Sequence, residues 1–325
     1  MRMLVTGGAG FIGSHYVRST LDGTRGGDLD SVVVLDKLTY AGDITNLDPV
    51  RKDDRLTFVR GDIADAVLVD RLVARSDVVV HFAAETHVDR SIAGAAEFVV
   101  TNVVGTQTLL DAALRHGVEK FVHVSTDEVY GSIDEGSWDE DQPLLPNSPY
   151  SASKAGSDLI ARSYYRTHGL PVVITRCSNN YGPYQFPEKV IPLFVTNLLD
   201  GRTVPLYGDG GNIRDWLHVD DHCAGIQLVL DKGGPGEIYN IGGGTELTNR
   251  RLTELLLEAC GCDWSSVEHV TDRLGHDRRY SVDITKITTE LGYRPRMDFA
   301  TGLADTIAWY RDNRAWWERH RPATG

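Results

Sequence analysis

A glycine-rich turn close to the start of the chain constrains the fold most. The run Gly8-Ala9-Gly10-Phe11-Ile12-Gly13 has the spacing G-x-G-x-x-G and lies between an apolar run, Met3–Thr6, and a helical pattern, Phe11–Leu21. In this context the backbone can approach a pyrophosphate, which the N–H groups of the helix N-terminus can bind. A glycine turn without a ligand is the alternative. Gly7 allows a second alignment of the motif, with glycines at 7, 10 and 13.

An acidic residue after the next apolar run favours the ligand. Asp36 ends Val32–Asp36, close to the spacing expected for a contact with the ribose of a dinucleotide. Its carboxylate can accept hydrogen bonds from the ribose hydroxyls and would repel a 2′-phosphate. NAD is therefore favoured over NADP, although Lys37 blurs the preference. Asp62, after the third run, could meet the adenine amino group, but a plain turn role explains it equally well.

Apolar, β-rich runs alternate with helical patterns through the first half of the chain. The runs are continuous, which is typical of a parallel sheet covered on both faces. This order predicts a doubly wound α/β fold with a parallel Rossmann sheet. The expected strands are Met3–Thr6, Val32–Asp36, Leu56–Arg60, Val78–Phe82, Phe121–Ser125 and Val172–Arg176. The expected helices between them are Phe11–Leu21, Ala66–Ala74, Ala96–His116 and Tyr150–His168.

The composition changes after Cys177, where Asn, Gly, Pro and Tyr become frequent. We predict a smaller, non-contiguous C-terminal lobe that binds the substrate. The NAD-binding Rossmann domain is expected to comprise residues 1–178 and about 214–242, and the lobe residues 179–213 and 243–325. Its expected elements are helices at Lys189–Leu199, Asn249–Ala259, Ile284–Leu291 and Thr301–Arg311, and a strand at Ile238–Ile241 just before it resumes.

Charge and cysteine usage exclude several classes of function. The net charge of −13 over 325 residues makes nucleic acid or a membrane surface an unexpected general partner. Only two of the four cysteines are close in sequence, and no second pair or histidine cluster completes a zinc pattern, so no metal site is predicted. The chain shows no signal-peptide pattern and no apolar run long enough to span a bilayer. We therefore expect a cytoplasmic protein with unreactive thiols.

Two pairs of polar residues follow the fifth expected strand. Tyr150 and Lys154 are four apart, so they share one face of a helix, and a cation near a tyrosine favours the phenolate over the ordinary pKa of about 10. Asp127 and Glu128 add a second acid and base. Two adjacent carboxyl groups split their titration, which allows Asp127 to be neutral while Glu128 is charged. Both must leave strand geometry to face one site, because neighbours on a strand point to opposite faces.

Each pair also has a simpler explanation. The acids could cap a helix or lie in a solvated turn, and Tyr150 and Lys154 could be a surface tyrosine and a solvated lysine. The position of the second pair at the start of a helix, after Ser148-Pro149, favours a catalytic role over these alternatives.

These motifs together resemble the extended short-chain dehydrogenases/reductases that act on nucleotide sugars. Within that group, Ser125–Gly131, His81–Ser91 and Arg176–Gln185 look like the dTDP-glucose 4,6-dehydratases, and the resemblance covers nearly the whole chain. Related 4-epimerases share the glycines and the Tyr/Lys pair but lack the adjacent acids. The residues that the resemblance and the motifs place at the cofactor are Gly7, Gly10, Phe11, Ile12, Gly13, Asp36, Lys37, Asp62, Ile63, Ala83, Tyr150 and Lys154.

The resemblance implies a reaction in which water is removed across C5 and C6 of a nucleotide-linked glucose. Tyr150 would take the C4 hydroxyl proton during oxidation by NAD, with Thr126 orienting the same oxygen. The 4-ketone makes the C5 proton acidic, so that Glu128 can remove it while Asp127 protonates the departing C6 hydroxyl. Return of the hydride to C6 gives a 4-keto-6-deoxy sugar. The catalytic residues expected are Thr126, Asp127, Glu128, Tyr150 and Lys154.

A nucleoside diphosphate requires local cations in an acidic protein, and Lys189, Arg214 and Arg273 are candidates, although each could be a surface charge. The expected substrate contacts are Glu85, Thr86, Asn180, Glu188, Lys189, Tyr207, Arg214, Asn249, Arg273 and His276. The resemblance also implies a homodimer built on Ala96–His116 and Tyr150–His168. The rival functions are a nucleotide-sugar 4-epimerase or decarboxylase, and a non-catalytic dinucleotide sensor.

Overall fold

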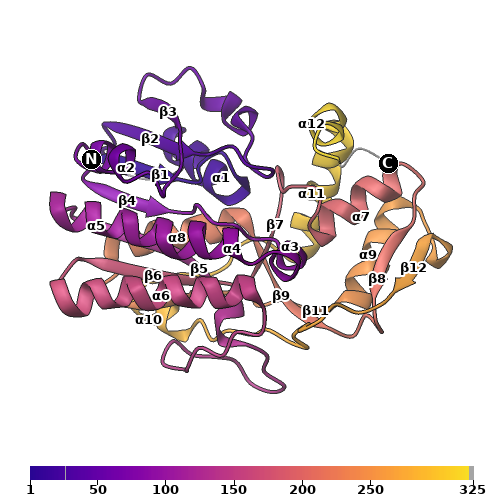
Figure 1. Ribbon diagram of the computed structural model, residues 1–325. Helices are drawn as coiled ribbons and strands as arrows, with labels where there is room; N and C mark the ends of the chain where they lie inside the picture. Colours follow the sequence, from indigo (N-terminus) through magenta and orange to yellow (C-terminus); the bar gives the residue numbers. More distant parts are fainter. Residues whose placement is uncertain (26, 322–325) are drawn as a thin grey trace.

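The structure, a computed structural model, describes residues 1–25 and 27–321. The centre of its larger lobe is a seven-stranded parallel sheet with the order β10-β6-β5-β4-β1-β2-β3 (Figure 1). The doubly wound α/β fold is thereby confirmed, and the strand order reverses between β1 and β4. The strands are β1 (Arg2–Thr6), β2 (Ser31–Asp36), β3 (Leu56–Arg60), β4 (Val78–His81), β5 (Lys120–Thr126), β6 (Val172–Cys177) and β10 (Ile238–Ile241).

Helices cover both faces of this sheet. Neighbouring residues of one strand enter different cores: Val79 packs in the cluster that contains Leu109, and Val80 packs in the cluster that contains Ile226. Burial on both faces explains why the strands are apolar throughout. One face is covered by α2 (Ala66–Val73), α5 (Thr106–His116) and α6 (Pro149–His168), and the other by α1 (Phe11–Leu21), α8 (Val219–Lys232) and α10 (Thr285–Leu291).

The sequence predicted one uninterrupted helix at Ala96–His116, and the structure corrects this prediction. The structure divides it into α4 (Ala96–Phe98), a π-helical segment (Val99–Gly105) and α5. A residue of the π-helical segment, Asn102, accepts a hydrogen bond from Glu85 N (2.8 Å) and donates to Ser153 Oγ (2.8 Å). Hydropathy spacing does not distinguish a π turn from an α turn, because the two differ in their backbone hydrogen bonds.

A smaller lobe follows β6 and contains most of the elements that the sequence did not predict. Short strands of mixed polarity form a three-stranded sheet, β11-β9-β7, and a two-stranded sheet, β12-β8. They are β7 (Asn179–Tyr181), β8 (Val204–Tyr207), β9 (Ile213–His218), β11 (Glu246–Thr248) and β12 (Val267–Val270). The helices of this lobe are α7 (Val190–Leu199), α9 (Asn249–Cys260), α11 (Phe299–Asp312) and α12 (Arg314–Glu318). The remaining short helices are α3 (Val88–Ala93) and the 3-10 turns Ile44–Val50, Asp127–Tyr130 and Trp264–Ser266.

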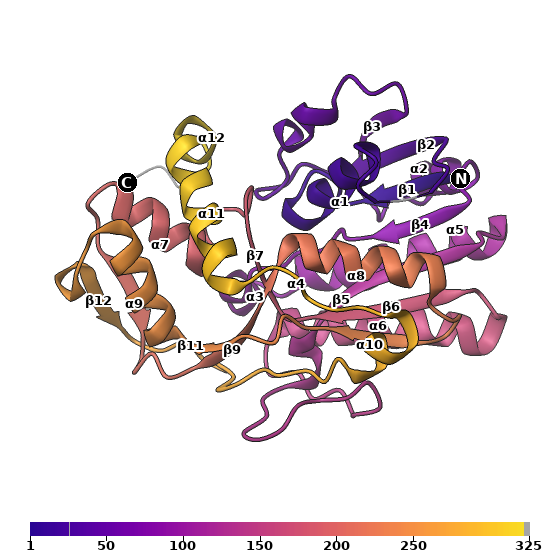
Figure 2. The ribbon, with the colours of Figure 1, turned by 180° about the vertical axis from the view of Figure 1, so that it is seen from behind.

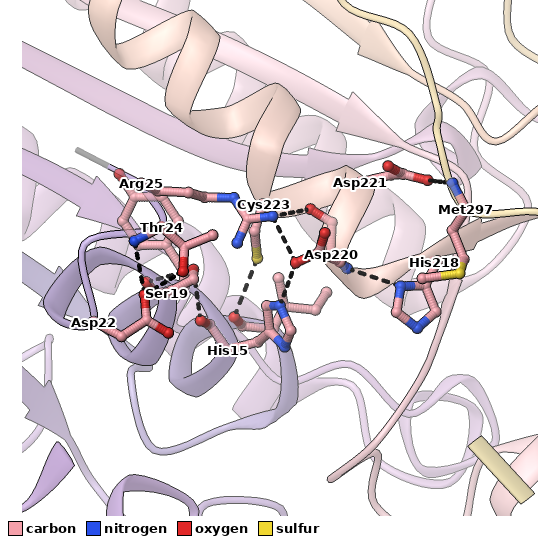
Figure 3. A network of polar contacts seen from close by, with 12 residues as sticks. His15, Ser19, Asp22, Thr24, Arg25, His218, Asp220, Asp221, Cys223 and Met297 are labelled. Atoms are coloured by element: carbon pink, nitrogen blue, oxygen red, sulfur yellow. Dashed lines mark hydrogen bonds and ion pairs between the residues drawn. The ribbon is translucent and has the colours of Figure 1, made fainter. Parts of the chain in front are cut away.

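No helix was predicted over α8, which returns from the smaller lobe to the central sheet (Figure 2). Its first turn is anchored by acidic side chains (Figure 3). Asp220 accepts hydrogen bonds from Arg25 Nη2 (2.6 Å) and contacts His15 Nε2 (3.1 Å), and Asp221 accepts one from Met297 N (2.9 Å). The helix that begins at the glycine turn is thus joined through α8 to the segment that leads into α11.

A fully buried charge cluster lies between α6 and the sheet. Asp158 accepts a hydrogen bond from Arg176 Nε (2.9 Å), and its other oxygen lies 3.2 Å from His123 Nε2. Although burial alone would raise it, these contacts lower the pKa of Asp158 to about 2. The carboxylate therefore stabilises the fold fully above its unfolded pKa of about 3.9, and this contribution is lost as the pH falls toward 2.

We expect Asp158→Asn to destabilise the protein by about 3–5 kcal/mol at neutral pH, because it leaves the Arg176 charge buried without its partner. Asp70→Asn is a matched control: Asp70 contacts Arg115 (2.9 Å) and His116 (3.0 Å) at the surface, and its loss is expected to cost less than about 1 kcal/mol. Urea unfolding of the two variants and the parent measures both values. Equal effects would contradict the assigned role of the cluster.

Candidate active site

The glycine turn is too tight for larger side chains. Gly7 has a φ of +70°, and a Cβ there would lie 2.6 Å from Ala83 N. A Cβ on Gly13 would lie 2.3 Å from Gly7 O. Gly10 occupies the N-cap position of α1 and has no side chain to cap the helix. The backbone N–H groups of the first turn, which lines the cavity, are therefore available to a ligand. This cradle fits a pyrophosphate.

The first cavity extends from this turn to the end of β5 and has a volume of about 300 Å³. Asp36 holds the turn: its carboxylate accepts hydrogen bonds from Ala9 N (2.9 Å) and Leu38 N (2.8 Å), and each oxygen can accept a further bond from a ribose hydroxyl. Lys37 and Asp62 form an ion pair at 2.7 Å, which sequence reasoning did not anticipate. All predicted cofactor residues line this cavity: Gly7, Gly10, Phe11, Ile12, Gly13, Asp36, Lys37, Asp62, Ile63, Ala83, Tyr150 and Lys154.

The acid pair lies where strand geometry ends. β5 stops at Thr126, and a 3-10 turn, Asp127–Tyr130, begins with the Thr126 hydroxyl accepting a hydrogen bond from Glu128 N (3.2 Å). The same hydroxyl donates to Asp127 Oδ1 (3.1 Å). The cap is therefore the threonine, and both acids line the cavity. The tight turn explains how adjacent residues can face one site.

The electrostatics of the two carboxyl groups differ. Burial, followed by the charge of Glu128, raises the pKa of Asp127 well above its ordinary value, and the side chain is 3% exposed. Burial also raises the pKa of Glu128, but Arg214 and Lys189 oppose the increase. The geometry therefore favours a protonated Asp127 beside an ionised Glu128.

Tyr150 and Lys154 lie on the first turns of α6. Ser148 caps the helix by accepting a hydrogen bond from Ser151 N (3.1 Å), and proline follows at the first helical position, which fixes where the helix begins. Lys154 Nζ donates to Val124 O (2.8 Å). Burial raises the pKa of Tyr150 well above 10, with Glu128 as the next contributor. The direction is opposite to that expected from Lys154 alone, because burial, reinforced by the charge of Glu128, disfavours the phenolate.

A second cavity, about 540 Å³ in volume, adjoins the first and opens toward the smaller lobe. Both walls include Glu128, Asn180 and Lys189, so Glu128 lies at the junction, whereas Asp127 lines only the first cavity. Nine of the ten predicted substrate residues line it: Thr86, Asn180, Glu188, Lys189, Tyr207, Arg214, Asn249, Arg273 and His276. The tenth, Glu85, lines only the first cavity.

Three cations converge on the second cavity. Arg214 is buried, with Nη2 donating to Asp277 O (3.0 Å) and its guanidinium 4.2 Å from the centre of the Tyr280 ring. Arg273 lies 5.0 Å from the Tyr207 ring centre. Lys189 Nζ donates to Thr86 O (3.0 Å), and burial lowers its pKa. These contacts position the cations toward an anionic ligand.

Polar residues complete the cavity wall. Asn180 Oδ1 contacts His222 Nδ1 at 2.9 Å, and its Nδ2 donates to Ser178 O (2.9 Å). Glu188 lies 3.3 Å from Arg90. His276 Nδ1 contacts Asp272 at 2.6 Å.

Sequence reasoning missed several residues of this wall. Tyr280 stacks on Arg214, and its hydroxyl donates to Asp277 Oδ2 (2.6 Å). His87, which also lines the second cavity, lies 3.6 Å from Glu188. The sequence could have indicated Tyr280, because it ends a segment, residues 273–280, in which polar and aromatic residues surround a glycine. Among residues 1–25 and 27–321 no group of acidic, histidine and cysteine side chains could hold a metal ion.

Comparison with known proteins identifies the family of this chain. The family profile described as GDP-mannose 4,6 dehydratase matches residues 4–306. A dTDP-glucose 4,6-dehydratase of Streptomyces antibioticus is 69% identical over 99% of this chain and 97% of its own length. The dTDP-glucose 4,6-dehydratase DesIV of Streptomyces venezuelae, solved with NAD bound, has a TM-score of 0.98 and 66% identity over 99% of this chain and 100% of its own.

A more distant solved structure, the UDP-glucose 4-epimerase of Thermotoga maritima, has a TM-score of 0.88 and 32% identity over 97% of this chain and 100% of its own. The fold is thus shared by dehydratases and epimerases. In sequence, this chain is more similar to the DesIV dehydratase, at 66% identity, than to this epimerase, at 32%. The chain belongs to the dTDP-glucose 4,6-dehydratase family within the extended short-chain dehydrogenases/reductases.

Proposed function

We propose that this chain is an NAD-dependent dTDP-glucose 4,6-dehydratase that serves deoxysugar biosynthesis. The observation that carries the proposal is the pair of adjacent carboxyl groups, Asp127 and Glu128, in the cavity that also contains Tyr150. The names of the curated relatives and the NAD in the DesIV structure support it.

Bound NAD supplies the acceptor for the C4 hydride and later returns it to C6. The phenolate of Tyr150 accepts the C4 hydroxyl proton, and Thr126 donates a hydrogen bond to the same oxygen. Glu128 then removes the C5 proton, which the 4-ketone has made acidic, and Asp127 gives its proton to the departing C6 hydroxyl. A proton returned to C5 completes a 4-keto-6-deoxy sugar. The protonation states required of the two acids are those that their pKa directions favour.

Tyr150 needs added positive charge to ionise. Burial and two carboxyl groups raise its pKa, while the Lys154 ammonium lies on the same helix face. The oxidised nicotinamide ring carries a positive charge, and its arrival in the first cavity favours the phenolate. Tyr150 would therefore become a base only in the complex that can accept the hydride.

The second cavity fits the nucleotide part of the substrate. Arg214, Arg273 and Lys189 supply positive charge for a diphosphate, and Tyr207 offers a ring against which a base can pack. The sugar would then extend toward Glu128, which lines both cavities. This placement brings C5 and C6 to the acid pair.

Incubation with dTDP-glucose tests the proposal directly. We expect a product one water lighter than the substrate by mass spectrometry, with the NAD regenerated. A product of unchanged mass would indicate the 4-epimerase. In a separate incubation with a nucleotide-linked uronic acid, loss of carbon dioxide would indicate the decarboxylase. Bound NAD with no turnover on any nucleotide glucose would indicate a sensor. The intact acid pair favours the dehydratase over all three.

We also propose the assembly and the division of the chain. Val99, Val100, Val104 and Leu159 are apolar and exposed on the helices expected to pair, which supports a homodimer. The packing of α8 on β5 and β6 supports a Rossmann domain of residues 1–178 and about 214–242, to whose sheet the later helix α10 adds further cover. No described helix combines the length and the apolar character needed to cross a bilayer. A nucleotide-sugar substrate supports a place in the cytoplasm.

A further inference from the structure

One buried residue joins the glycine turn to the C-terminal helix. Asn46 lies in the 3-10 turn Ile44–Val50 and is 1% exposed. Its Nδ2 donates to Ala9 O (2.9 Å), and its Oδ1 accepts from Trp316 Nε1 (2.9 Å). Its backbone oxygen accepts from Arg18 Nη1 (2.6 Å). Asn46 therefore joins the glycine turn and α1 to α12, which lies at the other end of the chain.

The two side-chain contacts fix the orientation of the Asn46 amide. A backbone carbonyl can only accept a hydrogen bond, and an indole N–H can only donate one. The amide can satisfy Ala9 and Trp316 in one orientation alone. Without the indole N–H, the buried Oδ1 would lack its donor, and the Asn46 side chain would keep only one of the two hydrogen bonds that hold it against Ala9 O.

Ala9 is central to the cofactor cradle. Its N–H donates to Asp36 (2.9 Å), and its carbonyl also accepts from Asp43 N (3.1 Å). The next peptide N–H, of Gly10, donates to Gly7 O (3.1 Å). The Asn46 amide thus helps to hold the peptide plane that connects the ribose-binding acid to the pyrophosphate-binding turn.

The residues that directly follow α12 are anchored to both lobes. On the cofactor side, His320 Nε2 lies 2.9 Å from Asp43 Oδ2, and Arg319 Nη2 donates to Thr45 Oγ1 (2.7 Å). On the other side, Arg321 forms an ion pair with Asp200, which follows α7. Figures 1 and 2 show α12 on the side of the smaller lobe that faces the Rossmann lobe.

We propose that α12 is a strap that retains NAD, with Asn46 and Trp316 as positioning residues that hold the glycine turn against the cofactor. The proposal rests on the NAD-dependent function given above. In that reaction one cofactor molecule has to stay bound from the oxidation at C4 to the reduction at C6. A contact from the substrate lobe to the cradle serves this requirement, because it keeps the cradle closed while the sugar is being processed.

A matched pair of variants tests the strap. Trp316→Phe keeps the aromatic packing and removes the N–H that reaches Asn46. Trp317→Phe is the control, since Trp317 is equally a buried indole donor but contacts Tyr310 O (2.6 Å) and not the cofactor side. Release of radiolabelled NAD from each holoenzyme into excess unlabelled NAD is measured. We expect about tenfold faster release for Trp316→Phe, the effect of losing about one buried hydrogen bond, and the parent rate for Trp317→Phe.

Two results would overturn the strap: parental release from Trp316→Phe, or equal acceleration in both variants, which would indicate general loosening of the lobe. Asn46→Ala provides a second route if Trp316→Phe does not fold, and its release is expected to be about tenfold faster, with a parental rate counting against the strap. In Asn46→Ala/Trp316→Phe the two effects should not multiply, because they remove one shared contact. A parent protein that binds no NAD would refute the proposed function instead.

Discussion

Tyr150→Phe is expected to abolish the first step of the reaction, lowering the rate of C4 oxidation by about 10²–10⁴-fold. The substitution removes the oxygen that takes the C4 hydroxyl proton and leaves the ring that packs beside Phe98 (ring centres 6.4 Å apart). Stability should change little, whereas no reduced cofactor should accumulate. Because oxidation precedes elimination, loss of this step also prevents the release of water.

The measurement is the absorbance of reduced nicotinamide after mixing NAD-loaded protein with dTDP-glucose in a single turnover. Tyr164→Phe is the control, since Tyr164 lies on the same helix but donates its hydroxyl to Asp111, away from the cavity. It should behave as the parent protein. A normal burst of reduced cofactor in Tyr150→Phe would show that another group accepts the proton.

Glu128→Gln and Asp127→Asn are expected to have equally large effects on a different step. Each keeps the shape of the side chain and removes one protonation state, so that C4 oxidation should proceed while dehydration falls by about 10²–10⁴-fold. Reduced cofactor should then accumulate with a 4-keto sugar that still carries its C6 oxygen. Mass spectrometry of the bound sugar, together with the nicotinamide absorbance, separates this outcome from failure of the first step.

The pH dependence of the dehydration step follows from the two pKa directions. Asp127 acts when protonated, so activity is expected to fall as the pH rises through its raised pKa. Glu128 acts when ionised, so activity is expected to fall as the pH drops below its own, less strongly raised pKa. In Asp127→Asn the alkaline decline should disappear from the residual rate. Full dehydration in either variant would exclude the replaced residue from the mechanism.

The central strands in the first half of the chain could be predicted almost completely. The continuous apolar runs place six strands of the sheet, and the observed bounds of β2 and β3 differ by at most one residue from those expected. A strand buried on both faces has no other composition available, which makes the signal strong. The strands of the smaller lobe were missed because their apolar residues follow no clear period over three to six positions. The helix α8 was missed although Val219, Cys223, Ile226 and Leu230 have helical spacing.

The residues of the candidate site could be predicted, but their electrostatics could not. The motifs identified Asp127, Glu128, Tyr150 and Lys154 as a group, and the cavity brings them together. The pKa of Tyr150 was expected to be lowered by Lys154, but in the structure burial and the acids raise it. Electrostatics depends on every charge within several ångströms, and sequence spacing supplies only the charges on one helix.

By itself, the sequence determined the parallel sheet, the cofactor turn and the types of residue available for proton transfer, because these depend on local periodicity and on motifs within a few residues. Only the tertiary structure decided how the lobes are joined. The path from Trp316 through Asn46 to Ala9 connects segments that are hundreds of residues apart, and neither asparagine nor tryptophan carries a motif. Such contacts arise from the packing of distant elements, which no short-range pattern encodes.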